Sequence, residues 1–214
     1  MRESEATLRA EGLTLSQRAL KRSFDLAIAV PGLILLLPLV AIAVIAATID
    51  TREWGVFTQE RIGRDGNPFK VHKVRSMRTS RLHTTTVTSA GDPRITPFGA
   101  LIRRTKIDEL PQLWNVICGS MSLVGPRPDV SGWADKLEGE DRIILSIRPG
   151  ITGPASLFFR DEESVLSAVS EPEEYNRTHI WPKKVQINKA YIQSWSIRND
   201  FMLILSTIGY PARA

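Results

Sequence analysis

Residues 26–49 read LAIAVPGLILLLPLVAIAVIAATI, a run of 24 uncharged residues between Asp25 and Asp50. At about 1.5 Å per residue, a straight helix of that length is roughly 36 Å long, enough to cross a hydrocarbon core of about 30 Å. Three interpretations compete: a secretory signal, a single transmembrane span, and a re-entrant hairpin that enters and leaves by the same face. The signal fits worst, because the apolar run exceeds the usual length of about 7–15 residues and 25 residues precede it.

Two features of the run favour the hairpin. Pro38 lies near its middle and Pro31-Gly32 interrupts its first half, and a mid-helix proline removes a hydrogen bond and bends the helix. Positive charge, which marks the cytoplasmic side of a membrane, flanks the run on both sides. The flanking cations are Arg18, Lys21 and Arg22 before it and Arg52, Arg61 and Arg64 after it. A kinked helix that spans the membrane once stays open as the alternative.

Composition narrows the class of protein. The 214 residues are 43% hydrophobic and 24% charged, which is ordinary for a globular chain and excludes a disordered or fibrous one. A single cysteine, Cys118, excludes an intramolecular disulfide framework and a cysteine-rich zinc site. A mean hydropathy of −0.10 excludes a polytopic membrane protein.

Positive charge is concentrated directly after the apolar run. Residues 52–104 hold eleven Lys or Arg and four Asp or Glu, whereas the whole chain carries a formal net charge of +5. A basic region beside a membrane segment indicates anionic lipid headgroups or a phosphate-bearing substrate as partners. Nucleic acid is not expected, because few aromatic residues are interleaved with these charges and no RNA- or DNA-binding motif is present.

The rest of the chain predicts mostly helices and one small hairpin. Thr96-Pro97 is typical of a helix start, and Gly119 of a helix end. The predicted strands are 56–62 and 68–77, joined by a turn at 64–67, and the predicted helices are 1–20, 96–104, 108–119, 133–147, 182–195 and 199–209. Residues 79–93 are expected to form a mobile loop. The apolar stretch 201–205 is too short to span a membrane and is expected at its interface.

Asp108 and Glu109 carry the sharpest chemical hypothesis. Two adjacent carboxylates stand at a predicted helix start, just after Arg103, Arg104 and Lys106. An ionised aspartate held among cations, near a divalent metal, could attack a phosphorus atom and form a covalent intermediate. The alternative is structural, because Thr105-x-x-Asp108 also fits a capping box. Spacing alone favours the capping box.

Four further cations are candidates for binding phosphate. Arg127 stands between Pro126 and Pro128, which restrict the backbone and present the guanidinium with little entropy left to lose. Lys73 and Arg75 share one face of a predicted strand and could meet the same anion. Arg148 precedes a rigid Pro149-Gly150 turn. For each of them a solvated surface position is the alternative.

Together these motifs resemble those of the small monotopic polyprenyl-phosphate phosphoglycosyl transferases, which are bacterial sugar transferases. The resemblance covers about residues 20–209 and has six blocks in the family's order. These blocks are Lys21–Asp25 (KRSFD), Gln59–Gly63 (QERIG), Phe69–Met77 (FKVHKVRSM), Ile107–Val116 (IDELPQLWNV), Gly119–Pro128 (GSMSLVGPRP) and Arg148–Gly153 (RPGITG).

The resemblance implies a fold and a location. The expected fold class is α+β and mostly helical. A re-entrant membrane helix-break-helix with its break at Pro38 would precede a small cytoplasmic domain with a short β-hairpin and amphipathic interfacial helices. The implied domains are an N-terminal extension (1–20), the membrane hairpin (21–50) and the catalytic sugar transferase domain (51–214). The protein would be monotopic in the bacterial inner membrane, with its active site facing the cytoplasm, and a homodimer is compatible with this arrangement.

The resemblance also implies a reaction. The family transfers a sugar-1-phosphate from a UDP-sugar to polyprenyl phosphate, usually undecaprenyl phosphate, and releases UMP at the start of surface-glycan or exopolysaccharide assembly. By position, Asp108 would be the nucleophile and Glu109 would help it to hold Mg²⁺. Lys73, Arg103 and Arg127 would bind phosphate groups, with Arg75 and Arg148 as further substrate-binding candidates.

This chain departs from the family's pattern at three places. Leu37 stands where many members have serine before the break proline, Pro154 follows Gly153 where tryptophan is common, and Asn188 replaces a common aspartate. None of these departures replaces the Asp108-Glu109 pair, so activity is still expected. A catalytically silent membrane-surface scaffold for glycan-assembly enzymes is the second hypothesis. A phosphatase or nucleotidase that transfers to water is the third.

Overall fold

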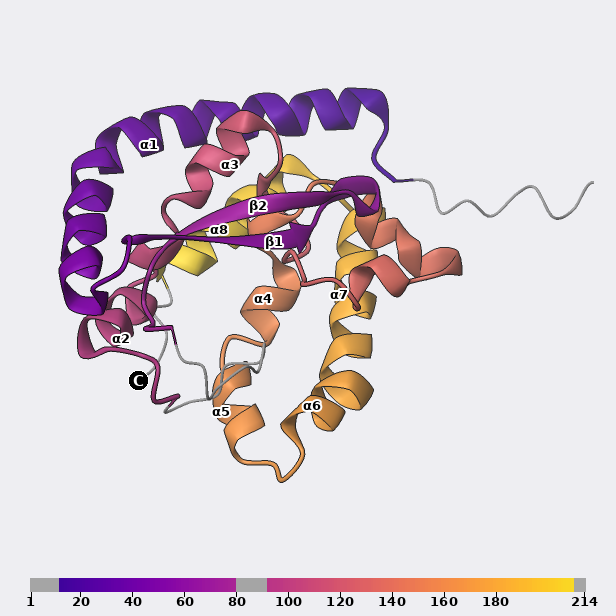
Figure 1. The fold of residues 1–214 in the computed structure, drawn as a ribbon. Helices are drawn as coiled ribbons and strands as arrows, with labels where there is room; N and C mark the ends of the chain where they lie inside the picture. The colour runs from indigo at the N-terminus through magenta and orange to yellow at the C-terminus, as the bar shows by residue number, and fades with distance from the viewer. Residues whose placement is uncertain (1–11, 80–91, 210–214) are drawn as a thin grey trace, which may run out of the picture.

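The computed structural model describes residues 12–79 and 92–209 and is mostly helical, with two small sheets (Figure 1). The helices and strands are α1 (Leu15–Thr51), β1 (Val56–Ile62), β2 (Pro68–Val74), α2 (Pro97–Arg104), α3 (Gln112–Cys118), β3 (Ser122–Val124), β4 (Gly150–Thr152), α4 (Pro154–Phe158), α5 (Glu162–Ser167), α6 (Pro172–Tyr175), α7 (Trp181–Gln193) and α8 (Ile197–Gly209). This arrangement confirms the α+β class. Residues 1–11 and most of the predicted 79–93 loop lie outside the described residues.

Helix α1 contains the apolar run and begins well before it. Thr14 caps the helix in a capping box with Gln17, and Arg52 ends it with a φ of 58°. The helix continues through Pro31 and Pro38, and Figure 1 shows it as one ribbon that turns a corner along its length. A bend is the expected result of a proline inside a helix. The structure therefore has one bent helix here, and the re-entrant hairpin stays a prediction.

The outward face of α1 is apolar. Among the described residues, α1 is the one helix that is long and apolar enough to cross a membrane, with a mean hydropathy of 2.9 over its most apolar window. Only 11% of that window is buried inside the protein. Ile34, Leu35, Ile42 and Ile49 are each at least 65% exposed. A surface this apolar favours contact with lipid.

The predicted hairpin is present. Strands β1 and β2 pair antiparallel from Val56 opposite Val74 to Ile62 opposite Pro68. A turn at Arg64–Gly66 joins them, with Asp65 and Gly66 both at positive φ. The second strand ends at Val74, three residues before its predicted end, so that Arg75 lies beyond the strand.

A second sheet has no counterpart in the predictions. Strands β3 and β4 pair parallel, with Ser122 opposite Gly150 and Val124 opposite Thr152. The backbones are so close that a Cβ on Gly150 would lie 2.2 Å from the Gly125 nitrogen, and one on Gly153 would lie 2.2 Å from the Gly125 oxygen. The glycines of the RPGITG block are therefore required by this contact.

Several of the remaining helix predictions are confirmed and one is wrong. Helix α2, capped by Thr96, and helices α7 and α8 agree with the predictions, as does Gly119, which ends α3 at a φ of 86°. The amphipathic helix predicted at 133–147 is wrong. Two 3-10 segments, Ala134–Lys136 and Gly139–Ser146, occupy this stretch, and the second begins at Gly139 with a φ of 57°. The elements between α4 and α7 were not predicted.

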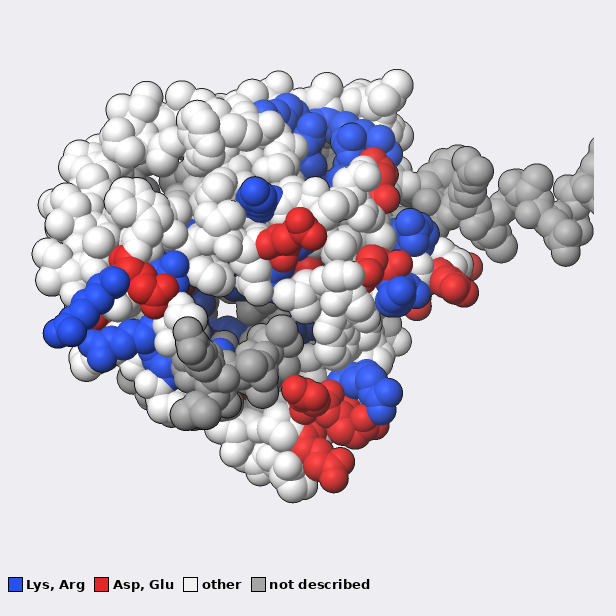
Figure 2. Space-filling model, in the orientation of Figure 1, with Lys and Arg blue, Asp and Glu red and all other residues white. Residues whose placement is uncertain are grey.

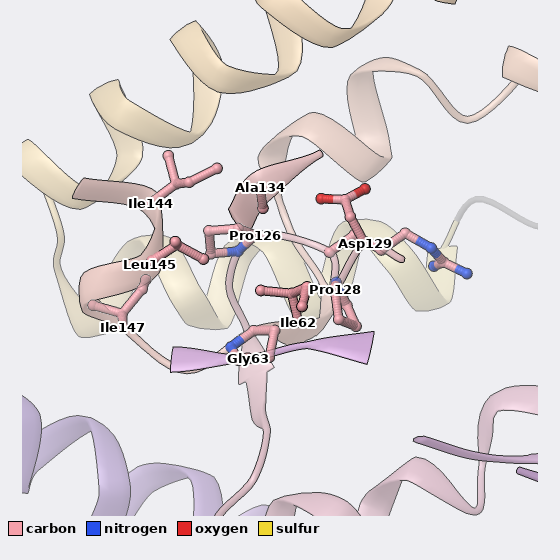
Figure 3. Close-up of a pocket in the computed structure, with 11 residues that line it drawn as sticks. Ile62, Gly63, Pro126, Pro128, Asp129, Ala134, Ile144, Leu145 and Ile147 are labelled. Carbon is pink, nitrogen blue, oxygen red and sulfur yellow. The ribbon is translucent and has the colours of Figure 1, made fainter. Parts of the chain in front are cut away.

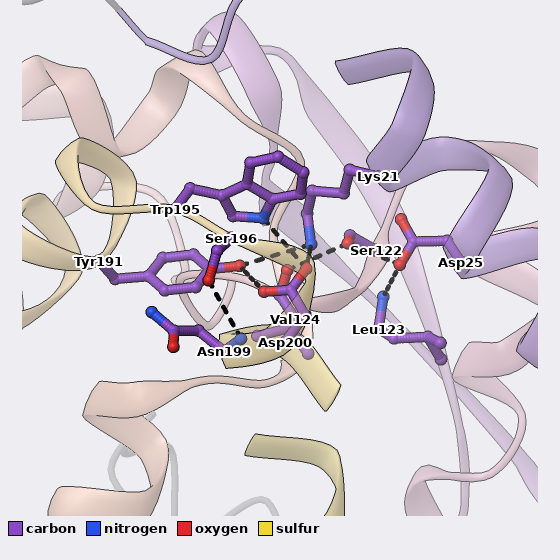
Figure 4. A network of polar contacts seen from close by, with 10 residues as sticks. All are labelled: Lys21, Asp25, Ser122, Leu123, Val124, Tyr191, Trp195, Ser196, Asn199 and Asp200. Carbon is purple, nitrogen blue, oxygen red and sulfur yellow. Dashed lines mark hydrogen bonds and ion pairs between the residues drawn. The ribbon is translucent and has the colours of Figure 1, made fainter. Parts of the chain in front are cut away.

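A buried polar network joins the N-terminal part of α1 to the C-terminal helices (Figure 4). Lys21 Nζ lies 2.6 Å from Asp200 Oδ2, and Asp200 also accepts hydrogen bonds from the Tyr191 hydroxyl at 2.6 Å and from Trp195 Nε1 at 3.1 Å. Asp200 is fully buried and the Lys21 side chain is 7% exposed. The network therefore connects residues at opposite ends of the described chain.

Candidate functional site

Asp108 and Glu109 lie in a 3-10 turn, Ile107–Glu109, between α2 and α3. Lys106 starts this turn in the left-handed conformation, with a φ of 59°. Thr105 uses its hydroxyl to donate to the Leu101 carbonyl at 2.9 Å and caps neither carboxylate residue. The capping-box alternative is therefore wrong, and the two carboxylates are left available for another role.

Asp108 is buried and partly unsatisfied. Its residue is 5% exposed, and its Oδ1 has no hydrogen-bond partner among the described residues. Burial, followed by the neighbouring Glu109 charge, raises the pKa of Asp108 to about 6, against the opposing influence of Lys73 and Arg103. A buried carboxylate oxygen without a partner is costly to keep and is typical of a functional position.

Glu109 is held by two cations from different parts of the fold. Its Oε1 accepts from Arg127 Nη2 at 2.6 Å and from Lys73 Nζ at 3.3 Å. Burial alone would raise the pKa of Glu109, but Arg127 and then Lys73 outweigh it and hold the pKa well below its usual range. Lys73 comes from β2 and Arg127 from the turn after β3, so the site forms only when these elements pack against the 3-10 turn.

The predicted phosphate-binding cations have three different surroundings. The Arg103 charge acts on Asp108, and its guanidinium pairs with Glu163 of α5. Arg75 instead lies 3.1 Å from Glu53, donates to the Trp54 carbonyl, and stands over the Phe57 ring. Arg148 donates through Nε to the Gly119 carbonyl at 2.7 Å, beyond the far end of α3. The structure thus brings Lys73 and Arg127 into contact with Glu109, while Arg103 acts on Asp108 through its charge alone and pairs with Glu163, and Arg75 and Arg148 have other partners.

Two residues that the site predictions omitted also belong to this charged cluster. Arg61 of β1 acts electrostatically on Lys73, Arg127 and Asp129 and donates to the Pro128 carbonyl at 3.4 Å. Burial raises the pKa of Asp129 to about 6, opposed by Lys184, Arg61 and Arg127. The sequence held signals for both residues, because Arg61 lies in the QERIG block and Asp129 directly follows Pro128.

A small pocket adjoins this cluster (Figure 3). Arg127 and Asp129 contribute its charged groups, whereas the rest of its wall is largely aliphatic. The aliphatic and proline side chains come from Ile62, Pro126, Pro128, Ala134, Ile144, Leu145, Ile147 and Pro149. The pocket therefore places Arg127 and Asp129 beside a mostly apolar wall.

The carboxylate pair fits a magnesium ion better than a closed metal centre. Within residues 12–79 and 92–209, no group of three His, Cys, Asp or Glu could hold a metal on its own. Mg²⁺ is usually held by one or two carboxylates together with water and substrate phosphates. The unpartnered Oδ1 of Asp108, next to Glu109, is consistent with such a donor set.

The sequence has relatives among known proteins. The sequence matches the family described as bacterial sugar transferase over residues 16–213. It is 35% identical over 91% of its length to the UDP-galactose-lipid carrier transferase of Erwinia amylovora. It is 34% identical over 89% to the UDP-glucose:undecaprenyl-phosphate glucose-1-phosphate transferase of Escherichia coli (strain K12), and 38% identical over 88% to the undecaprenyl-phosphate glucose phosphotransferase of Komagataeibacter xylinus.

The match covers only part of each of these relatives. The chain spans 40% of the Erwinia and Escherichia proteins and 35% of the Komagataeibacter protein. The family match itself includes the 3-10 turn with Asp108 and Glu109, the strand with Lys73 and the turn with Arg127. On these grounds, the chain belongs to the bacterial sugar transferase family.

Proposed function

We propose that this protein transfers a sugar-1-phosphate from a UDP-sugar to undecaprenyl phosphate or a similar polyprenyl phosphate, and releases UMP. The names of its relatives support this class of reaction. The observation that carries the proposal is the buried Asp108, whose Oδ1 has no hydrogen-bond partner among the described residues, beside a Glu109 that two cations hold ionised. The reaction would be the first membrane step in the assembly of a surface glycan or exopolysaccharide.

The first step uses Asp108 as a nucleophile. One carboxylate oxygen attacks the phosphorus that bears the sugar, the bond from this phosphorus to the bridging oxygen breaks, and UMP leaves with the electron pair. A pKa of about 6 leaves Asp108 ionised at neutral pH and more basic than an ordinary aspartate. Lys73, Arg103 and Arg127 bind the phosphate groups and stabilise the charge that develops on them.

The second step regenerates the aspartate. A phosphate oxygen of the polyprenyl phosphate attacks the same phosphorus, and the Asp108 carboxylate leaves. The products are a polyprenyl diphosphate sugar and the free enzyme.

Glu109 and Asp108 are the residues that would hold Mg²⁺. The ion would neutralise charge on the diphosphate of the donor. Arg127 and Lys73 fix the Glu109 carboxylate through Oε1 and thereby orient it before any substrate binds.

The test is UMP release by the purified full chain, assayed with a panel of UDP-sugars, with and without undecaprenyl phosphate and Mg²⁺. We expect release that needs the metal and the lipid and that favours one sugar. No release with any donor, from protein shown to be folded, would overturn the proposal in favour of the scaffold. Free sugar-1-phosphate together with UMP, formed without the lipid, would indicate a hydrolase instead.

We further propose that α1 enters the inner membrane of a bacterium and returns to the same face, with the active site in the cytoplasm. The bend of α1, its exposed apolar surface and the cations on both sides of residues 26–49 support this topology. Helix α8 would lie at the interface, because Phe201, Met202, Leu205 and Ile208 are all at least 47% exposed.

A reporter fused to the C-terminus tests this topology. We expect it on the cytoplasmic side, and three lysines added after Ile49 should leave it there, because both ends of a hairpin already face the positive side. The unaltered chain with the same reporter is the control. A reporter in the periplasm would show that α1 spans the membrane.

A further inference from the structure

Two arginines from distant parts of the chain bind the C-terminal end of α3. Arg22 of α1 donates through Nη1 to the Val116 carbonyl at 2.5 Å and through Nη2 to the Ile117 carbonyl at 2.9 Å. Arg148, just before β4, donates through Nε to the Gly119 carbonyl at 2.7 Å. The last carbonyls of a helix lack partners within the helix, and cationic donors satisfy them well. We call Arg22 and Arg148 the α3 clamp.

Helix α3 connects this clamp to the reactive carboxylates. Its seven residues span about 10 Å, and the 3-10 turn with Asp108 and Glu109 ends two residues before its other end. The clamp therefore holds the far end of a short rigid element and touches neither carboxylate. A rotation or shift of α3 would move the two carboxylates with it.

The side chain of Asn115 links α3 to the strand that supplies Lys73. Asn115 Oδ1 accepts from the His72 backbone nitrogen at 3.1 Å, and its Nδ2 donates to the Lys70 carbonyl at 2.7 Å. These bonds set the register of α3 against β2. The 3.3 Å contact between Lys73 and Glu109 thus depends on where α3 sits.

We propose that Arg22 and Arg148 are positioning residues that fix α3, and so orient Asp108 and Glu109 toward Lys73 and Arg127. This inference rests on the proposed function. It reassigns Arg148 from substrate binding and makes the base of the membrane helix a part of the catalytic framework. Both terminal nitrogens of Arg22 are engaged with α3 carbonyls, which favours positioning over a role in binding an anion.

The competing interpretation is an anion site. Arg18, Arg22 and Arg64 all act electrostatically on Arg148, and Figure 2 shows Lys and Arg side chains gathered near the N-terminal half of α1. Such a patch could bind the phosphate of a lipid. The two interpretations differ in the kinetic constant that they affect, because a positioning residue changes kcat and a binding residue changes KM.

The experiment compares the full-length wild type with Arg22→Gln, Arg22→Lys and Arg148→Gln. Arg18→Gln is the matched control, since Arg18 lies one turn earlier on α1 and binds the Leu13 carbonyl instead of α3. We expect Arg22→Gln and Arg148→Gln each to lower kcat about 10- to 100-fold, the range for a small misplacement of catalytic groups, with KM for donor and lipid unchanged. Arg22→Lys should recover part of the loss, and Arg18→Gln should match the wild type.

Two kinetic outcomes would overturn the inference. A raised KM for the lipid at unchanged kcat, shared by Arg18→Gln, would assign the patch to anion binding. Wild-type kinetics with only a lower melting temperature would make the clamp purely structural. If Arg22→Gln does not fold, Arg22→Lys decides the matter, because it keeps the charge and loses one of the two bonds.

Hydrogen exchange separates this inference from the proposed function. Without any UMP release by the wild type the proposed function fails, but the amides of residues 107–118 still report on α3. We expect faster exchange of these amides in Arg22→Gln and no change in Arg18→Gln. Unchanged exchange in Arg22→Gln would overturn the clamp whatever the activity.

Discussion

Replacement of Asp108 by asparagine is expected to abolish UMP release, with a loss of about 10³-fold or more. Asparagine keeps the size of the side chain, but its neutral amide is a far weaker nucleophile than a carboxylate. Mass spectrometry of protein quenched after mixing with donor should find a sugar-phosphate adduct on the wild type and none on Asp108→Asn. Asp65→Asn, the same change in the exposed β1–β2 turn, is the control and should retain full activity. Residual turnover near the wild-type level in Asp108→Asn would exclude Asp108 as the nucleophile.

The same variant is expected to be more stable than the wild type at neutral pH. Burial raises the pKa of Asp108 from 3.8 to about 6, so the folded state holds the ionised carboxylate less favourably than the unfolded chain does. This penalty is absent below about pH 4, grows as the pH rises to about 6, and then stays constant at about 2–3 kcal/mol. Asparagine has no charge to bury. The melting temperature of Asp108→Asn should therefore exceed that of the wild type at pH 7.5 and meet it near pH 4, and a gap that is equal at both pH values would exclude burial of the charge as its cause.

The largest loss of stability is expected from Asp200→Asn. The change leaves the buried Lys21 ammonium without its directly bonded carboxylate, at a cost of about 3–5 kcal/mol. For a chain of this length, such a loss lowers the melting temperature by roughly 10 °C. Thermal unfolding in detergent, followed by circular dichroism, measures the shift.

A second variant separates the buried charge from the hydrogen bonds. Lys21→Met combined with Asp200→Asn removes both charges. The asparagine oxygen can still accept from Trp195, and its amide nitrogen can donate to the Tyr191 hydroxyl, so most of the stability should return. Glu140→Gln, which opens the surface pair with Lys189, is the control and should leave the melting temperature unchanged. A double variant as unstable as Asp200→Asn would show that the buried ion pair is not the cause.

Local signals in the sequence were sufficient for several elements of the fold. Thr96-Pro97 predicts the start of α2, Gly119 predicts the end of α3, and the turn residues at 64–67 predict the β1–β2 hairpin. Each of these depends on neighbouring residues and on backbone preferences. The parallel β3–β4 pair could not be predicted in this way, because each strand has three residues and their pairing joins positions far apart in the chain.

The helix prediction for residues 133–147 was wrong for a different reason. Its apolar residues suggested one helical face, but Ile143, Ile144 and Leu145 are consecutive and all buried. One face of an α-helix cannot bury three successive side chains, and Gly139 interrupts the segment at positive φ. The spacing of apolar residues does not show that this segment is packed tightly on all sides.

The carboxylates and the two cations that contact Glu109 were predictable, but the partners of the other predicted cations were not. Asp108, Glu109, Lys73 and Arg127 belong to blocks with recognisable spacing, and the structure brings them together. A count of positive charges does not reveal the partner of each one. Arg75 pairs with Glu53 and Arg148 binds the end of α3, and only the packing of distant segments shows this.

The bond between Lys21 and Asp200 links residues that are 179 positions apart, which has a consequence for biosynthesis. A ribosome makes the chain from the N-terminus, so α1 emerges long before the carboxylate that Lys21 needs has been translated. During that interval the apolar run can already contact the bilayer, whereas Lys21 near the N-terminal end of α1 cannot yet pair with Asp200. Insertion into the membrane is therefore expected to precede closure of the domain, and a ribosome that stalls before residue 200 would leave an anchored chain whose catalytic framework is still open.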